Sequence, residues 1–162
     1  MDLNLGYDYI NNMAETDSLQ GSVIVPGALI EHTAGMALHA IVNMDALTVI
    51  FEHVTAADDF NTADLQFNGA KASPAATNIE IAYTLDMAGR EMTIALAHQS
   101  TSDMDTASIG LPESVNLLSV STTVADDVAL AVEFKNASDY EKADNGSGES
   151  GSTVTAQLAV EF

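Results

Sequence analysis

The sequence contains no cysteine and no tryptophan, and only 4 of its 162 residues are lysine or arginine. Without cysteine, disulfides, thiol catalysis and cysteine-ligated zinc or iron–sulfur sites are excluded. The 24 aspartates and glutamates leave a formal net charge of −20. Because phosphate groups are bound mainly by lysine and arginine, this charge argues against nucleic acid as a partner and against docking onto an anionic membrane surface.

Long hydrophobic runs are also missing. The longest uncharged hydrophobic stretch lies between Glu31 and Asp45, which is shorter than the roughly 18 apolar residues of a transmembrane helix. The first residues, Met1 to Asn4, lack the basic and apolar regions of an export signal. For an exported protein we therefore expect either that the numbering starts after processing or that the chain is the C-terminal piece of a longer protein.

What the sequence does contain is an alternation of apolar and polar residues with a period of two, which is typical of strands with two different faces. The hydrophobic content of 47% is too high for a chain that is disordered throughout. The length is suitable for one domain, and we treat residues 1–162 as such. The alternation predicts eight strands, at residues 3–10, 36–43, 47–53, 78–85, 91–99, 115–123, 128–135 and 153–162.

The connections between these segments alternate in length. Short turns are expected at residues 44–45, 87–89 and 125–127, and long polar connections at residues 14–27, 56–77, 102–114 and 136–152. Each unit of two strands, one turn and one long connection takes about 40 residues, and short turns opposite long loops are characteristic of outer-membrane barrels. Strands of roughly 9–11 residues also suit a tilted span of a membrane.

Two points stay open at the level of sequence. Residues 28–54 are rich in alanine, leucine and methionine, which favour a helix, although Gly35, Val42 and the run 48–50 favour strands. In the segment 115–123 both Leu117 and Leu118 are apolar, so the alternation does not assign its faces.

A soluble β-sandwich alternates in the same way, but two features favour a barrel. The polar positions hold mostly alanine, threonine, serine, asparagine, glutamine and glutamate, whereas soluble sheets usually protect their edges with lysine. The sequence also closes on an alternating strand that ends in an aromatic residue, like the assembly signal of outer-membrane barrels. The residues of this expected signal are Val154, Ala156, Leu158, Val160 and Phe162.

Several motifs also resemble the C-terminal half of the LbtU-type siderophore porins. They are Tyr9-Ile10-Asn11-Asn12, the segments 39–44 and 55–60, Gly69-Ala70-Lys71, the segment 110–113, and the final run 153–162, which is the most similar part. The resemblance covers almost the whole chain, but the N-terminal half and the export signal of the family have no counterpart. It implies a bacterial outer-membrane barrel involved in the uptake of iron–siderophore complexes.

The polar face of the expected sheet is acidic, with a single base. Its charged residues are Asp8, Glu52, Glu80, Glu91, Glu133, Glu161 and Lys135. In a barrel these side chains would face the lumen, and a ring of carboxylates would favour cations over anions. On an exposed sheet they would simply be solvated.

No cofactor, metal site or enzymatic activity is expected. The sequence has no nucleophile elbow, no phosphate-binding glycine loop and no zinc-protease motif. None of its four histidines, His32, His39, His53 and His98, is two residues from another, as a metal site on one strand face would require. The loop carboxylates could suit calcium, with Asp103-Met104-Asp105 in alternate positions, but no EF-hand pattern follows and we expect ordinary solvated charge.

The sequence thus predicts an all-β fold, an antiparallel up-and-down transmembrane β-barrel with about eight strands in this chain. The expected function is passive, porin-like uptake of a solute across the bacterial outer membrane. The expected partners are the lipid bilayer, the outer-membrane assembly machinery and a small solute. Most inward residues are small, and the acids among them have almost no bases to compensate them. We therefore expect a wider lumen, completed by a missing N-terminal half or by other copies of the chain. The alternative is a secreted or periplasmic acidic β-sandwich that acts as a binding module.

Overall fold

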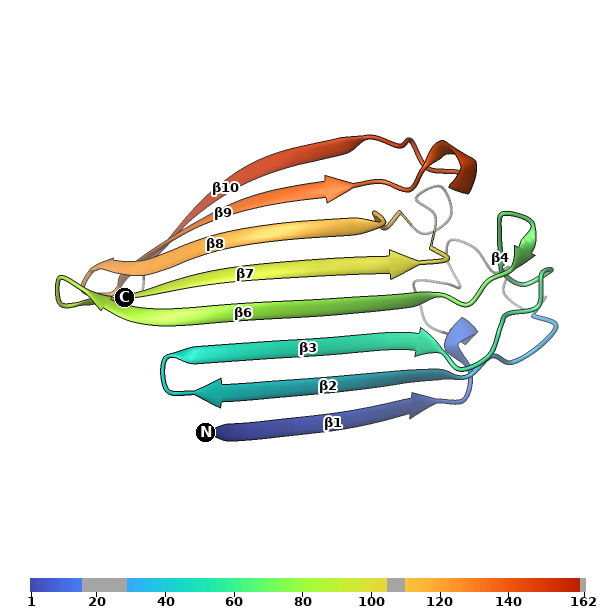
Figure 1. Cartoon of the computed structure of the whole chain (residues 1–162), viewed down its shortest axis with the longest axis horizontal. Coiled ribbons are helices and arrows are strands. Elements are labelled where there is room, and N and C mark those ends of the chain that lie inside the picture. Colours follow the sequence, from blue (N-terminus) through green and yellow to red (C-terminus); the bar gives the residue numbers. More distant parts are fainter. Residues whose placement is uncertain (16–28, 105–109, 161–162) are drawn as a thin grey trace.

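The computed structural model describes residues 1–15, 29–104 and 110–160, which form an antiparallel sheet of eight strands (Figure 1). The strands are β1 (Asp2–Ile10), β2 (Gly35–Met44), β3 (Leu47–Ala56), β6 (Ala75–Met87), β7 (Arg90–Ser102), β8 (Ser114–Ala125), β9 (Val128–Ser138) and β10 (Ser150–Val160). Each pairs with the next in the order β1-β2-β3-β6-β7-β8-β9-β10. The prediction of an all-β, up-and-down arrangement with eight strands is therefore confirmed.

The helical alternative for residues 28–54 is not what the chain adopts, because β2 and β3 occupy this region as a hairpin with Ile41 opposite Ile50. The register between β7, β8 and β9 also assigns the faces that the sequence left open. Leu118 lies opposite Leu96 and Phe134, whereas Leu117 lies opposite Ala97 and Lys135 on the other face.

Three tight turns join β2 to β3, β6 to β7 and β8 to β9 at one end of the sheet (Figure 1). Each turn contains a residue with positive φ: Asp45 at 49°, Ala88 at 59° and Asp127 at 60°. Aspartate adopts this left-handed conformation more readily than most side chains. Ala88 is followed by Gly89, also at positive φ, whose N–H donates to the Asp86 carboxylate at 3.0 Å. The three tight turns therefore lie where the sequence predicts them.

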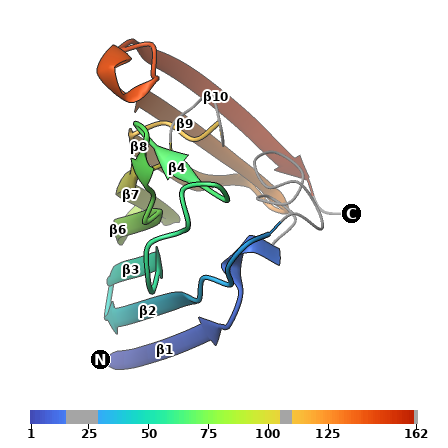
Figure 2. The same cartoon turned by 90° about the vertical axis from the view of Figure 1, so that its right-hand side faces the viewer.

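The sheet is strongly curved, and its first and last strands approach the open side of the curve (Figure 2). Within the described residues β1 and β10 are the two edges, and no pairing joins them. The short 3₁₀ helix η1 (Met13–Glu15) lies on the concave side, and a β-carbon on Gly35 would be 3.1 Å from the Met13 side chain. The face to which Gly35 belongs is therefore the concave one.

Long connections gather at the other end of the sheet and carry the most completely buried residues of the described part. The connection core consists of Ala14, Ala56, Phe60, Leu65 and Ala72, with Met13, Leu29 and Phe67 packed against it. The connection from β3 to β6 supplies most of these side chains. It also contains the two-residue strands β4 (Gln66–Phe67) and β5 (Ala70–Lys71).

This β3–β6 connection binds the other connections together. The buried Asp64 carboxylate accepts hydrogen bonds from the N–H groups of Ile30 at 2.9 Å and Glu31 at 3.1 Å. The N–H of Ser73 donates to Asp103 at 2.8 Å, which joins the connection to the end of β7. Phe67 packs edge-on against Tyr140, with ring centroids 5.7 Å apart.

The connection from β9 to β10 is compact, and it includes the 3₁₀ helix η2 (Lys142–Asp144). Asp139 accepts hydrogen bonds from the N–H and hydroxyl of Ser147 at 2.7 and 2.6 Å. Gly146 lies so close to Tyr140 that a β-carbon would be 1.9 Å from the Tyr140 carbonyl oxygen. None of the helices in the described part of the chain has the length and apolar character needed to span a membrane.

Candidate functional site

The two faces of the sheet differ sharply in composition, because residues paired across neighbouring strands point to the same side. One face, called the apolar face, carries large aliphatic and aromatic side chains on all eight strands. Its main members are Leu3, Leu5, Tyr7, Tyr9, Met36, Leu38, Val42, Val49, Phe51, Ile79, Ile81, Tyr83, Ile94, Leu96, Leu118, Val120, Leu130, Val132, Phe134, Val154, Leu158 and Val160.

No second layer of the described residues covers this apolar face. Leu5 on β1 is 69% exposed, Leu96 on the central strand β7 is 58% exposed, and Val154 on β10 is 68% exposed. Contiguous exposed apolar surface of this extent marks a site of contact with lipid or with another protein. The eight strands have 9–13 residues each, enough for a tilted membrane-spanning strand.

A row of polar side chains ends the apolar face toward the long connections. This polar rim consists of His53, Thr77, His98, Asn116, Asn136, Ser138, Ser150 and Ser152. Its members bond to each other across strands, with His53 Nδ1 and Thr77 Oγ1 2.8 Å apart and His98 Nδ1 and Asn116 Oδ1 2.9 Å apart.

On the last two strands of the rim, the Asn136 amide donates to the Ser152 hydroxyl at 3.0 Å. The hydroxyls of Ser138 and Ser150 are 2.9 Å apart. The next residues on the same face of these strands, toward the tight-turn end, are Phe134 and Val154. The change from polar to apolar side chains therefore takes place within two residues. His53 and His98 both lie on the apolar face, and β3 and β7 continue beyond them to Ala56 and Ser102.

The opposite, concave face carries the predicted charged residues. Asp8, Glu52, Glu80, Glu91, Glu133 and Lys135 all fall on it by register, spread over five strands, and Glu161 lies outside the described residues. Most other positions on this face hold small side chains. Whether this face lines a lumen stays a prediction.

The single lysine of the concave face, Lys135, is far from some of its acids. Lys135 is on β9 and Glu52 on β3, four strands apart, which corresponds to about 19 Å at the usual strand spacing. The nearest partner of Glu52 is instead an amide, since Asn78 Nδ2 donates to its carboxylate at 3.1 Å. On β1, β2, β3 and β6 this face therefore carries acids and neither lysine nor arginine.

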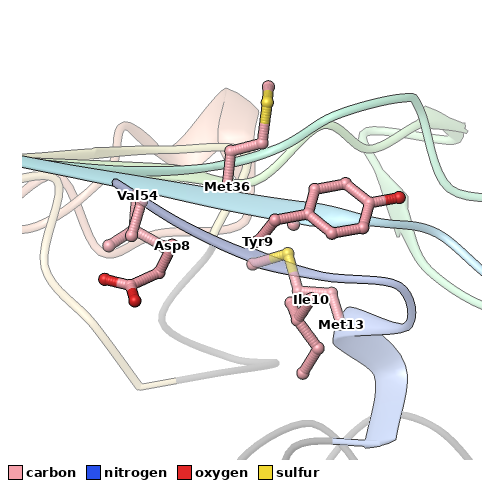
Figure 3. A pocket seen from close by; sticks show the side chains of 8 residues that line it. Asp8, Tyr9, Ile10, Met13, Met36 and Val54 are labelled. Atoms are coloured by element: carbon pink, nitrogen blue, oxygen red, sulfur yellow. The ribbon is translucent and has the colours of Figure 1, made fainter. Parts of the chain in front are cut away.

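A small apolar recess interrupts the concave face near the end of β1 (Figure 3). Ile10, Met13, Ala37 and Val54 line it, and Asp8 is the one charged residue among its lining side chains. Two residues further along β2 and β3, His39 lies opposite Glu52. The His39 imidazole in turn lies 3.2 Å from the Asn4 amide oxygen.

The expected assembly signal lies on the last strand. Val154, Ala156, Leu158 and Val160 point to the apolar face of β10, and they pair with Phe134, Val132, Leu130 and Val128 of β9. Phe162, the aromatic end of the signal, lies outside the described residues. Every described residue of β10 is exposed, because this strand is paired on one side only.

Sequence reasoning missed the connection core. The sequence predicts a long polar connection at residues 56–77, yet Phe60 is fully buried and Leu65 is 3% exposed. Asn68-Gly69, a strong turn signal, could have revealed the β4–β5 hairpin. Among residues 1–15, 29–104 and 110–160, no three histidine, aspartate or glutamate side chains form a group suited to a metal ion.

Comparisons with known proteins give distant relatives and no assigned function. A UPF0422 protein of Coxiella burnetii (strain RSA 493 / Nine Mile phase I) is 20% identical over 84% of this chain and 29% of its own length. UPF0422 proteins of Legionella pneumophila are 25% identical over 94% of this chain and 31% of their length in strain Paris, and 24% over 98% and 35% in strain Lens. The chain thus spans about a third of these curated relatives. No profile of a known protein family matches it, and no solved structure does.

Proposed function

We propose that this chain forms part of the wall of a porin-like β-barrel in a bacterial outer membrane and allows passive passage of a solute. The observation that carries the proposal is the apolar face, which extends over all eight strands without cover from the described residues and lies opposite a polar, acidic face. A membrane-spanning strand needs lipid-facing apolar residues alternating with polar residues toward the interior. The resemblance to LbtU-type siderophore porins suggests an iron–siderophore complex as the solute.

The polar rim supports the same arrangement. In outer-membrane barrels the apolar band is flanked by residues that tolerate the water interface, and long loops lie on one side with short turns on the other. Here the hydrogen-bonded rim lies between the apolar face and the long connections. We place the long connections on the outer side of the membrane and the three tight turns on the inner side.

The complete lumen requires more strands than these eight. The edges β1 and β10 do not pair with each other in the described residues. An eight-stranded barrel has an interior just wide enough to be filled by side chains, and the small residues of the concave face would leave it empty. Further strands from a longer chain, or from other copies, would widen the barrel and hydrate the carboxylates.

The competing proposal, a soluble β-sandwich, needs a second sheet packed on the apolar face. The described residues form one large sheet and a two-stranded hairpin at its end. Partition between detergent and buffer separates the two proposals. A barrel requires detergent and migrates differently on gels before and after heating, whereas a sandwich stays soluble and monomeric without detergent.

Conductance tests the pore directly. The complete protein is reconstituted into planar bilayers, and the reversal potential is measured across a potassium chloride gradient. We expect open channels that prefer potassium, with the preference reduced when Glu52, Glu80 and Glu133 are all replaced by glutamine. The variant Asp126→Asn, a charge loss in a tight turn, should keep the preference. Absence of conductance, or selectivity for chloride, would refute the proposed pore.

A further inference from the structure

Charge is divided between the two faces of the sheet. In the described residues of the eight strands, every aspartate and glutamate lies on the concave face, including Asp86 and Glu91 beside the β6–β7 turn. The apolar face of these strands instead carries three side chains that can hold a positive charge, Arg90, His53 and His98. The net charge of −20 therefore does not describe this face, and the argument against an anionic surface as its partner does not apply to it.

Strand β7 has such a side chain at each end of its apolar stretch. Arg90 precedes and His98 follows Met92, Ile94 and Leu96 on the same face. The eight residues from Arg90 to His98 span about 27 Å along the strand, or about 21 Å across a membrane at a tilt of about 40°. The long arginine side chain extends further, toward the edge of an apolar band about 25 Å tall. Arg90 is thus at the level where hydrocarbon ends and lipid headgroups begin.

The end of β8 holds the Arg90 side chain at this level. The pairing of β8 with β9 shifts by one residue between Thr123 and Ala125. Such a bulge leaves the extra residue, here Val124, outside the regular ladder. The Arg90 guanidinium donates through Nη1 to the Val124 carbonyl. This acceptor is neutral and takes one of the five N–H donors of the exposed guanidinium, so the positive charge and the other donors remain for an anion.

We propose that Arg90 binds the phosphate group of a phospholipid at the tight-turn end of the apolar face. The planar donors of a guanidinium suit phosphate oxygens, and the acyl chains of the same lipid suit Met92, Ile94 and Leu96 beside it. A soluble anion would match only the arginine. The inference rests on the proposed function in one respect, because it takes the apolar face to be in contact with a bilayer.

Arg90 is the sole arginine of the sequence, so one isotope label reports on it. The chain, labelled with ¹³C at arginine Cζ, is reconstituted into vesicles of phosphatidylethanolamine and phosphatidylglycerol. Solid-state NMR measures dephasing of the Cζ signal by lipid ³¹P, which requires the two nuclei to be close. We expect strong dephasing, and its absence would overturn the proposal. Equal dephasing by inorganic phosphate in a phosphate-free detergent would assign the site to a soluble anion and would also overturn it.

A double variant is the matched control for the position of the guanidinium. Arg90→Lys combined with Lys135→Arg keeps the composition and the net charge, but it moves the arginine to the concave face. We expect the dephasing by lipid ³¹P to be lost. Equal dephasing in the wild type and the double variant would show that lipid attracts a guanidinium anywhere on the sheet, which contradicts a site at Arg90.

Lipid preference gives a second readout. Electron paramagnetic resonance compares the association of spin-labelled phosphatidylglycerol with that of spin-labelled diacylglycerol, which lacks the phosphate. Arg90→Gln should lower the preference for phosphatidylglycerol roughly 2- to 5-fold, the range of an exposed ion pair, and Arg90→Lys should lower it less. Lys142→Gln removes the same charge from η2 and should have no effect. An unchanged preference in Arg90→Gln would refute the proposal.

The outcome is distinguishable from that of the pore experiment. Dephasing at Arg90 in a protein that does not conduct would refute the proposed pore and keep the lipid site. Cation-selective conductance without dephasing at Arg90 would keep the pore and refute the lipid site.

Discussion

Gly6 and His39 are paired across β1 and β2, and the imidazole ring of His39 occupies the space of the missing Gly6 side chain. A β-carbon on Gly6 would be 2.0 Å from His39 Cε1. The ring can lie over the β1 backbone and reach the Asn4 amide only because residue 6 is glycine.

Gly6→Ala should therefore displace the imidazole and break its contact with Asn4. We expect a loss of about 1 kcal/mol in the free energy of unfolding, the usual net value of one hydrogen bond. Gly151→Ala is the matched control, because Gly151 is also on an edge strand and its β-carbon would meet nothing within 4 Å. Denaturant unfolding of both variants measures the difference. Equal stability of the two would show that the ring moves aside without cost.

Asp64 should be a main determinant of stability at the loop end. Replacing it with alanine leaves the N–H groups of Ile30 and Glu31 without their acceptor, at a cost of about 1–3 kcal/mol. The comparison is Asp59→Ala, an exposed acid in the same connection. Limited proteolysis should cut the Asp64 variant in its connections faster than the wild type. Equal cleavage of both variants would contradict the assigned role of Asp64.

Tyr140 should make the loop end sensitive to alkali. Burial raises the pKa of the Tyr140 phenol, and the Glu113 and Asp103 carboxylates raise it further. Its hydroxyl lies 2.7 Å from Thr101, whose own proton is donated to the Pro112 carbonyl, so Tyr140 is the donor. The folded state holds this proton more tightly than the unfolded state, so stability is constant below the ordinary tyrosine pKa of about 10 and falls as the pH rises above it.

Tyr140→Phe should be less stable than the wild type near neutral pH, because it lacks the hydrogen bond to Thr101, and the difference should shrink as the pH rises above about 10. Unfolding midpoints measured between neutral pH and pH 11 test this. A constant difference in stability between the two proteins over that range would show that ionisation of the Tyr140 phenol is not linked to unfolding.

The absence of cysteine makes the proposed lipid contact of the apolar face directly measurable. Ala156 and Ala159 are both exposed on β10 and point to opposite faces of the sheet. Spin labels on Ala156→Cys should be accessible to oxygen in reconstituted vesicles, and labels on Ala159→Cys to a water-soluble nickel chelate. Ser152→Cys, in the polar rim, should lie at the water interface. Water exposure at Ala156 would argue against membrane insertion.

The strands could be predicted because alternation is a local property of the sequence. Val128, Leu130, Val132 and Phe134 show their common face without knowledge of the neighbouring strands. The connection core could not be predicted in this way, because Phe60 and Leu65 are buried by chain segments far from them in sequence. The recess was missed for the same reason, since Met13 and Val54 line the same recess only after β1, β2 and β3 have paired.

The β3–β6 connection also makes the two ends of the sheet differ in how firmly the strands are held together. Its contacts with Ile30, Asp103 and Tyr140 fasten the strands at the loop end, beside the connection core. At the other end the described residues have no buried cluster, and neighbouring hairpins are joined by hydrogen bonds such as those from Thr84 to the Ala46 carbonyl and from Arg90 to the Val124 carbonyl. The strands can consequently fan apart at the tight-turn end more easily than at the loop end. Any opening of the curved sheet between β1 and β10 would then start at the tight-turn end. Amide protons at that end would exchange sooner than those beside the connection core.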